Sequence, residues 1–383
     1  MDRYYFDNAA STQPYKEVIG AYSSFAYDTY ANPSALHEFG NSVNKACIYA
    51  KKQLLDCLEL TDREVIFTSG ATESTNLAIT GIVDNATNSD NVHIVTTEFE
   101  HSCILEVVNK HINRGVDATV IKVGKYGKID IDTLISAIKP TTRLVSITWV
   151  SNENGIINDI DSIAVQVKKV NKNTLVHVDA VQGIGKVKPN FKNIDMISLS
   201  AHKFHGLKGI GALVMKKNVP LKPVILGGGQ QSGYRSGTVN APMIYSLGVT
   251  CEIINSKTNE NKLYKLQSYL YSSLANKFTE LNINTQIFED NFAPHILSLT
   301  IKGIKSEVII HILESFNIYV SASSACSTHH KNKSALKALN FTKEQIDGTI
   351  RISISEFTTY EQIDFMTEKL YEAINRFQGI RKK

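Results

Sequence analysis

Between residues 61 and 215, short apolar runs alternate with amphipathic stretches, and this alternation limits the chain to few folds. Seven runs have the length and composition of buried strands: Glu64–Thr68, Val92–Thr96, Ala118–Lys122, Arg143–Val150, Thr174–Val178, Asp195–Leu199 and Gly211–Met215. Helical patterns lie between most of them, for example Thr72–Val83, Asp130–Ile138 and Asp159–Val170. Strands that are apolar throughout and alternate with helices predict an α/β fold, with a mostly parallel sheet covered on both faces.

The pattern changes after Gly248. A long polar helical stretch near Asn255–Leu281 leads into further predicted elements, namely strands at Ile296–Ile301, Ile318–Ser321 and Thr349–Ser353 and helices at Ser306–Phe316 and Tyr360–Phe377. This arrangement predicts a smaller α+β domain. We expect residues 16–255 to form a large domain, and residues 1–15 and 256–383 to form the small one.

Composition excludes several classes of protein. With 43% hydrophobic and 20% charged residues, the 383-residue chain is neither disordered nor collagen-like. No apolar run reaches the roughly 18 residues that a membrane helix needs, and the N-terminus lacks an apolar signal segment, so we expect a cytoplasmic protein. The formal net charge is +4 and the one dense basic cluster is the tail Arg381–Lys383, which argues against nucleic acid as a direct partner.

Five cysteines are scattered along the chain, without a CxxC pair: Cys47, Cys57, Cys103, Cys251 and Cys326. Their spacing excludes a disulfide framework and a zinc ribbon, and it suits a reducing compartment. Four are expected to be small core residues. Cys326 differs because it lies in a run of small polar residues, Ser321–His330, which predicts a mobile, exposed loop and a reactive thiol. A zinc site of Cys326, His329 and His330 is the alternative, although it lacks a fourth ligand.

Polar residues follow two neighbouring predicted strands. Asp179 ends one of them, and Ser200, His202 and Lys203 follow the next. Ligands of such sheets bind at the carboxyl ends of strands. Asp179 alone would also suit a helix cap or a metal ligand, but lysine is seldom buried without a partner. A lysine that forms a Schiff base, facing an aspartate that holds a pyridinium nitrogen, is typical of pyridoxal phosphate sites.

Three more segments supply groups for such a cofactor. Ser69–Glu73 follows a strand and opens a helix, so the backbone N–H groups near Ala71 and the hydroxyl of Thr72 could bind a phosphate, together with Ser200 and His202. The same segment would also suit an ordinary helix N-terminus. His101 could stack on the ring and move protons, or be an ordinary core or surface histidine. Gln182 could reach the ring oxygen, and Asn152 could donate to cofactor or substrate.

Taken in order, these segments resemble the pyridoxal phosphate cysteine desulfurases of the NifS/IscS type, which have the class V aminotransferase (type I transferase) fold. The resemblance covers nearly the whole chain. The matching segments are Asp7–Ala10, Asn32–Ser34, Phe67–Glu73, Glu100-His101, Asn152–Gly155, His177–Gln182, Ser200–Lys203, Gly227–Gly229, Arg235–Thr238, Ser323–Cys326 and Arg351–Ser353.

The resemblance implies specific roles for these residues. Lys203 would anchor pyridoxal 5′-phosphate, Asp179 and Gln182 would hold its ring, and His101 would stack on it. Other residues would bind the phosphate and the substrate: Ala71, Thr72, Ser200 and His202 for the phosphate, Thr238 for the phosphate in the partner subunit, and Asn152 and Arg351 for L-cysteine. Cys326 would take the sulfur as a persulfide and leave L-alanine. A homodimer with shared sites is therefore expected.

The chain departs from the family pattern after the carboxylate-binding arginine. Where the family has Ser-Leu-Gly-Arg, this chain has Ser353-Ile354-Ser355-Glu356, which reverses one charge. Lys331–Ser334 also replaces the family's segment after the cysteine. The sulfur acceptor therefore stays open between an iron–sulfur scaffold protein, a tRNA-thiolating enzyme and another thiol carrier. A transaminase or lyase on the same fold, or a non-catalytic adaptor, are the alternative functions.

Overall fold

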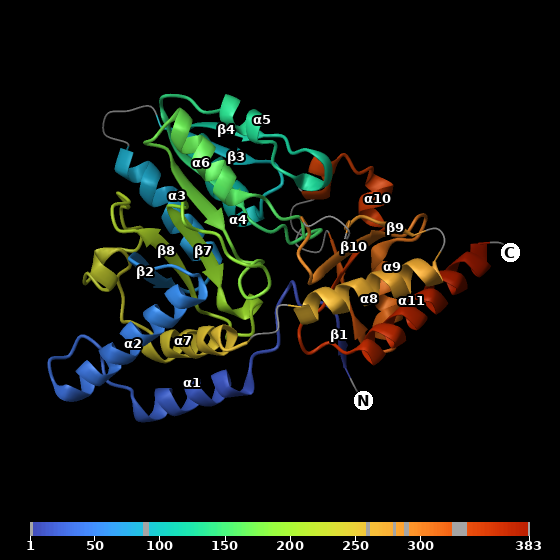
Figure 1. Cartoon of the computed structure of the whole chain (residues 1–383), viewed down its shortest axis with the longest axis horizontal. Helices are drawn as coiled ribbons and strands as arrows, with labels where there is room; N and C mark the ends of the chain where they lie inside the picture. Colours follow the sequence, from blue (N-terminus) through green and yellow to red (C-terminus); the bar gives the residue numbers. More distant parts are fainter. Residues whose placement is uncertain are drawn as a thin grey trace.

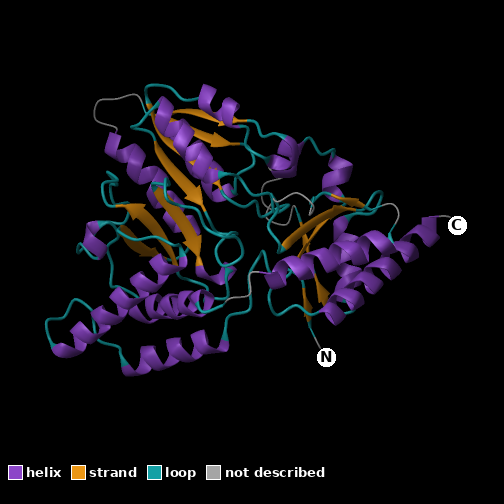
Figure 2. Ribbon diagram, in the orientation of Figure 1, coloured by secondary structure: helices purple, strands orange, loops and turns teal. Residues whose placement is uncertain are grey.

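The computed structural model describes residues 3–86, 92–257, 261–278, 281–286, 291–323 and 335–381. Its larger sheet has seven strands in the order β2-β8-β7-β6-β5-β3-β4 (Figures 1 and 2). The strands are β2 (Arg63–Thr68), β3 (His93–Thr97), β4 (Asp117–Ile121), β5 (Thr142–Thr148), β6 (Leu175–Asp179), β7 (Met196–Ser200) and β8 (Gly211–Lys216). β3 to β7 are parallel, while β8 runs antiparallel to both β2 and β7. The predicted mostly parallel α/β sheet is confirmed.

Both faces of this sheet are buried. Successive residues of one strand enter different apolar clusters: Ile94 and Leu144 pack on one face, and Val95 and Val145 on the other. This is the two-residue alternation of an extended strand. One face is covered by α3 (Ala71–Ala86) and α4 (Ser102–Ile112), and the other by α2 (Glu38–Cys57), α5 (Ile131–Ser136), α6 (Ile160–Val170) and α7 (Ala241–Asn255). We call these two clusters together the large core.

Helices near the N-terminus were not anticipated from the sequence. α1 (Lys16–Asp28) and α2 both pack on α7. A Cβ on Gly248 of α7 would lie 2.7 Å from the Cα of Ala50 on α2, so the two backbones approach as closely as glycine allows. Small residues at this crossing, rather than a long apolar stripe, explain the close packing of the two helices.

A second, smaller sheet has the strand order β12-β13-β10-β9 and is antiparallel. Its strands are β9 (Asn282–Ile283), β10 (Ile296–Thr300), β12 (Ser321–Ala322) and β13 (Thr349–Ser353), and β1 (Tyr4–Tyr5) pairs with β11 (Ile318–Tyr319) beside it. Leu297, Leu299, Ile350 and Ile352 of this sheet pack with Phe6 in what we call the small core.

Helices cover the small sheet: α8 (Asn261–Lys277), α9 (Ser306–Glu314), the short α10 (Lys343–Asp347) and α11 (Tyr360–Arg381). Figure 1 shows α8, α9 and α11 packed together beside β10. α8 is shorter at both ends than the helix predicted over Asn255–Leu281, because α7 already extends to Asn255 and Asn282 begins β9. Within the described residues, no helix is both long and apolar enough to cross a membrane.

Candidate active site

A cavity of about 690 Å³ lies at the carboxyl ends of the central parallel strands. Thr148 ends β5, Asp179 ends β6 and Ser200 ends β7, and all three line it. The opposite wall comes from the small sheet and the N-terminal segment, through Ser321–Ser323, Arg351, Asp7, Ala9 and Ala10. The cavity therefore lies between the large core and the small core, where the topology of a parallel sheet places ligands.

The N-terminus of α3 forms one end of this cavity. Ser69, Gly70, Ala71 and Thr72 line it together with Ser200. A Cβ on Gly211 of β8 would lie 2.7 Å from the Cα of Gly70, so this glycine lets the turn before α3 approach the sheet. The first N–H groups of a helix lack intrahelical acceptors and carry partial positive charge, so this end can bind an anion.

His202 lies at the same end. Burial, together with the charges of Lys203 and Lys208, lowers the pKa of His202 to about 4, so its imidazole is neutral near pH 7. Its Nδ1 lies 3.2 Å from the hydroxyl of Ser11. A neutral imidazole can donate a single hydrogen bond from one nitrogen, which suits a hydroxyl or phosphate oxygen in the cavity.

Asp179 is 5% exposed, and its Oδ1 accepts a hydrogen bond from the backbone N–H of Val181 (3.0 Å). Burial raises the pKa of this carboxyl, against the opposing influence of His101, Val181 and Lys203. A cation beside Asp179 would hold it ionised, because an opposite charge favours the charged form. Asp179 is thus equipped to bind a protonated ring nitrogen.

His101 caps α4. The backbone N–H of Cys103 donates to its Nδ1 (3.2 Å), so in the neutral ring the proton resides on Nε2. Burial is the main reason that the pKa of His101 lies below its usual value. The residue therefore combines a structural role, which the sequence had left open, with an imidazole that lines the cavity.

Lys203 and Gln182 both bind the N-terminal segment. The Nζ of Lys203 donates to the carbonyl oxygens of Ala9 (2.8 Å) and Ala10 (3.0 Å). Gln182 Nε2 also donates to the Ala9 carbonyl (2.9 Å), while its Oε1 lies 3.2 Å from His295 Nε2. These contacts orient both side chains across more than 110 residues of sequence, and the sequence alone did not indicate them.

Arg351 on β13 is 6% exposed and lies across the cavity from the sheet. It donates to the carbonyl oxygen of Asn152 (2.8 Å) and to Asp7 Oδ1 (2.9 Å). Asn152 in turn donates to Glu153 Oε1 (3.0 Å), and burial raises the pKa of Glu153 to about 7. Asp7 and Glu153 were not predicted as site residues, since only the fold brings them to Arg351.

Three of the six buried side-chain polar atoms that lack a hydrogen bond, among the described residues, belong to residues that line this cavity. In the part of the chain that the structure describes, Arg351 Nε, Glu153 Oε2 and Ser323 Oγ are buried without a hydrogen bond, and all three residues line it. Leaving such atoms unsatisfied costs about 1–3 kcal/mol each. A bound ligand with both acceptor and donor groups, such as an amino acid, would satisfy them.

Two predicted residues are not placed at this cavity. Thr238 is exposed and does not line it, and its predicted role toward a partner subunit stays a prediction. Cys326 lies outside the described residues, as do His329 and His330 of the alternative zinc site. No cluster of three or more His, Cys, Asp or Glu side chains able to hold a metal ion occurs among the described residues.

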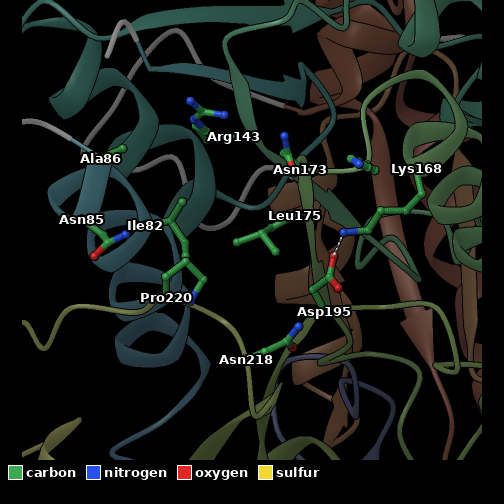
Figure 3. A pocket seen from close by; sticks show the side chains of 11 residues that line it. Ile82, Asn85, Ala86, Arg143, Lys168, Asn173, Leu175, Asp195, Asn218 and Pro220 are labelled. Carbon is green, nitrogen blue, oxygen red and sulfur yellow. Dashed lines mark ion pairs between the residues drawn. The ribbon is translucent and has the colours of Figure 1, made fainter. Parts of the chain in front are cut away.

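A second cavity, of about 500 Å³, lies at the opposite ends of the same strands (Figure 3). Arg143 and Leu175 near the starts of β5 and β6 line it, together with Asp195 just before β7. Figure 3 shows Lys168 paired with Asp195, whose charges are 2.7 Å apart. None of the predicted site residues lies here, and its buried carboxylate, Asp195, pairs with Lys168 and Lys216, which are features of a structural site.

The fold and the cavity define a class of protein: an α/β enzyme with a lysine, an aspartate and a histidine at the strand ends and an arginine opposite. The chain belongs to the aminotransferase class-V family, whose model matches residues 4–366. It is 34% identical to a cysteine desulfurase of Nostoc sp. over 99% of this chain and 95% of that protein. It is 36% identical to cysteine desulfurase IscS of Buchnera aphidicola, over 98% and 94% of the two chains.

Solved structures give the same result. A NifS-like protein superposes with a TM-score of 0.90 at 33% identity, covering 98% of this chain and all of the other. A structure described as SspA in complex with cysteine superposes with a TM-score of 0.81 at 30% identity, covering 94% of this chain and 100% of the other. The resemblance to the NifS/IscS type is therefore confirmed across the chain.

Proposed function

We propose that this chain is a pyridoxal-phosphate-dependent cysteine desulfurase, which converts L-cysteine to L-alanine and transfers the sulfur to its own Cys326. The observation that carries the proposal is the cavity that brings Lys203, Asp179 and His101 to one wall and Arg351 to the other. The alternative of a non-catalytic adaptor is disfavoured, because an adaptor has no need of this complete and buried set.

The residues present fit pyridoxal phosphate. Asp179 would hold the ring nitrogen, His101 would lie against the ring, Gln182 would bind beside it, and Lys203 would anchor the aldehyde carbon. The α3 N-terminus at Ala71 and Thr72, with Ser200 and His202, would hold the phosphate. When bound, the cofactor supplies an electron sink for the electrons of the substrate Cα.

Arg351 would bind the α-carboxylate of L-cysteine with its planar donors. Its Nε is buried without a partner among the described residues, and NH1 and NH2 are already oriented by Asn152 and Asp7. In its uncharged form, Lys203 Nζ would take the proton from Cα, and His101 Nε2 would carry a proton as the sulfur departs. Asn152 would lie near the substrate amine.

Cys326 would accept the sulfur. Ser321–Ser323 line the cavity, and only Ser324 and Ala325 stand between Ser323 and Cys326 in the sequence, so the chain joining them can span at most roughly 11 Å. The thiolate of Cys326 would attack the substrate sulfur, so that a new S–S bond forms as the C–S bond breaks. The products are a persulfide on Cys326 and L-alanine.

The enzyme would act as a homodimer with shared sites. Thr238 is exposed and would reach the phosphate of the partner subunit. Apolar side chains are also exposed in loops of the large domain: Tyr30 at 76%, Leu36 at 104% and Leu226 at 77%. Pairing with another chain through these loops would remove the three side chains from water.

The two cores support a large domain over residues 16–255 and a small domain formed by 1–15 and 256–383. The persulfide would pass to an acceptor protein, either an iron–sulfur scaffold or a tRNA-thiolation enzyme, in the cytoplasm. A direct nucleic acid partner or a membrane is not part of the proposal.

The test uses the purified chain with pyridoxal phosphate and L-cysteine under reductant. We expect yellow cofactor absorbance, equal amounts of alanine and sulfide, and a persulfide on Cys326 found by thiol labelling. Cys326→Ser should retain the absorbance and lose sulfide release, with Cys57→Ser as the matched control that retains both. Sulfide release at the normal rate by Cys326→Ser would refute the nucleophile, and transamination or β-elimination products in place of alanine would favour the alternative enzyme classes.

A further inference from the structure

Glu356, at the position where the family pattern has an arginine, contacts the two segments in which the chain crosses between the large core and the small core. The chain passes from the small core to the large core between Phe6 and Phe25, and returns between Ile254 and Leu263. Tyr15 lies on the first crossing and Lys257 on the second. Figure 1 shows α1 and α7 on one side of these crossings and β1 and α8 on the other.

Glu356 binds both crossings at once. Lys257 Nζ donates to both carboxylate oxygens of Glu356, each at 2.6 Å, and the Tyr15 hydroxyl donates to Oε1. Lys257 also lies 4.2 Å from the centre of the Tyr15 ring. Lys262 Nζ donates to the backbone carbonyl of Glu356 at 2.6 Å. Burial would raise the pKa of Glu356, but the bonds from Lys257 and Tyr15 outweigh it and the pKa is lowered.

The same carboxylate contacts the turn that carries Lys203. His205 Nε2 lies 3.9 Å from Glu356 Oε1, and the imidazole stacks on Tyr15 with ring centres 4.9 Å apart. The other ring nitrogen, Nδ1, lies 2.7 Å from the carbonyl of Gln13, and the Tyr15 N–H donates to the His205 carbonyl at 3.0 Å. His205 is two residues beyond Lys203, so the turn is fixed from both its backbone and its side chain.

Glu356 also lies close to the proposed carboxylate clamp along the chain. It follows β13, which ends at Ser353 and carries Arg351. Ser353 N–H donates to the Phe6 carbonyl at 2.7 Å, and Ile354 N–H donates to the His295 carbonyl at 3.0 Å. These bonds fix the backbone between Arg351 and Glu356, so the side chain of Glu356 links a firmly held continuation of the Arg351 strand to the turn that carries Lys203.

We propose that the crossing cluster (Glu356, Lys257, Tyr15 and His205) is a positioning device that sets the separation of Arg351 from Lys203 and thereby the affinity for the amino acid substrate. The inference rests on the proposed function only for the identity of that substrate. Its members are positioning residues, because none of them lines the cavity. The arginine of the resembling enzymes could not accept these bonds, so the device belongs to this chain and relatives with an acidic residue here.

The first measurement is steady-state kinetics with L-cysteine. Glu356→Gln keeps the shape and the bond to Tyr15 but loses the charge that binds Lys257, so we expect KM to rise about tenfold while kcat stays within about threefold. Lys257→Met removes the same ion pair from the other side and should raise KM by a similar factor, and combining it with Glu356→Gln should add little further change, because both substitutions remove one interaction. Glu368→Gln, which removes an exposed small-domain pair with Lys277, is the matched control and should change neither parameter.

The second measurement is amide hydrogen exchange on the cofactor-free protein, which does not depend on activity. Glu356→Gln should raise exchange in residues 200–207 and 350–357 together, whereas Glu368→Gln should not. Faster exchange confined to residues 354–358, or an unchanged KM in an active enzyme, would overturn the proposal. If wild type fails to turn over L-cysteine but the two segments still respond together, the proposed function falls and the positioning device stands.

Discussion

Asp179 and Asp195 are buried aspartates near opposite ends of neighbouring strands, and they differ in what surrounds them. They are 5% and 3% exposed. Asp195 is bound by Lys168 (2.7 Å), Lys216 (2.9 Å) and the N–H of Val176 (2.8 Å). Asp179 faces His101 and Lys203 in a cavity and accepts a hydrogen bond from one backbone N–H.

This difference separates a structural carboxylate from a reactive one. Burying an ion pair with complete hydrogen bonding holds elements together, and removal of either partner is costly. A carboxylate that is buried without such pairing destabilises the fold and is retained for its chemistry. Burial alone would not distinguish the two aspartates. Substitutions at the two ends of the sheet test this contrast, and those at the catalytic end should have the larger effects on turnover.

Lys203→Ala should produce the largest effect. The variant removes the group proposed to anchor the cofactor and to take the Cα proton, so we expect kcat to fall by at least about 10⁴-fold. Borohydride reduction should no longer fix the cofactor to the protein. Lys168→Met at the structural end is the control, and it should retain kcat within about threefold. A reducible cofactor linkage in Lys203→Ala would show that another amine is the anchor.

Asp179→Asn should lower kcat by about 10³-fold, or about 4 kcal/mol of transition-state stabilisation, because a neutral amide cannot hold a protonated ring nitrogen. Burial raises the pKa of Asp179, so its charge costs stability and the variant should melt at the same temperature as wild type or higher. The measurements are turnover of L-cysteine and thermal unfolding of the cofactor-free protein. A marked loss of stability would show that Asp179, like Asp195, stabilises the fold, and the two aspartates would then not differ in role.

Asp195→Asn should show the reverse pattern. The amide can still accept from Val176 but no longer pairs with two lysines, which are partly exposed and can be solvated. We therefore expect a loss of about 2 kcal/mol in the free energy of unfolding. Turnover should stay within about threefold of wild type, since the carboxylate lies at the second cavity. Denaturant unfolding measures the free energy of unfolding. A large fall in kcat with unchanged stability would contradict this prediction.

The sequence predicts the catalytic end of the sheet better than the rest of the site, for a physical reason. Asp179 and Ser200 end runs that are apolar throughout, and parallel strands bring such ends together. Lys203 and Ala9 are 194 residues apart, and only the fold brings them into contact. Arg351 meets Asp7 across 344 residues, so its partner was not predictable from local pattern.

Glu356 also shows that contacts between residues distant in sequence cannot be predicted from local pattern. The reversed charge was visible in the sequence, but its partners Tyr15 and Lys257 lie 341 and 99 residues away. The helices α1 and α2 were not predicted, although α2 buries Val43, Cys47, Ala50 and Leu54 at helical spacing, so the local pattern for α2 was present in the sequence.

Glu100 offers the smallest and most specific test of the contrast, since it is a third buried carboxylate, 4% exposed, directly before His101. The hydroxyls of Thr97 and Thr148 lie 2.7 and 2.5 Å from its two oxygens, within hydrogen-bond distance. Burial raises the pKa of Glu100 from 4.5 to about 8 despite these bonds. The native state therefore keeps this proton between pH 4.5 and about 8 while the unfolded state releases it, so stability falls as pH rises through that window.

Glu100→Gln mimics the protonated acid, because its amide can accept from one threonine and donate to the other. Between pH 7 and pH 8, wild type should lose about 1 kcal/mol more stability than this variant. Denaturant unfolding at the two pH values measures the difference, with the exposed Glu106→Gln as the matched control that follows wild type. Equal losses in Glu100→Gln and wild type would mean that Glu100 is ionised in the native state, and Glu100 would then not belong with the reactive carboxylates.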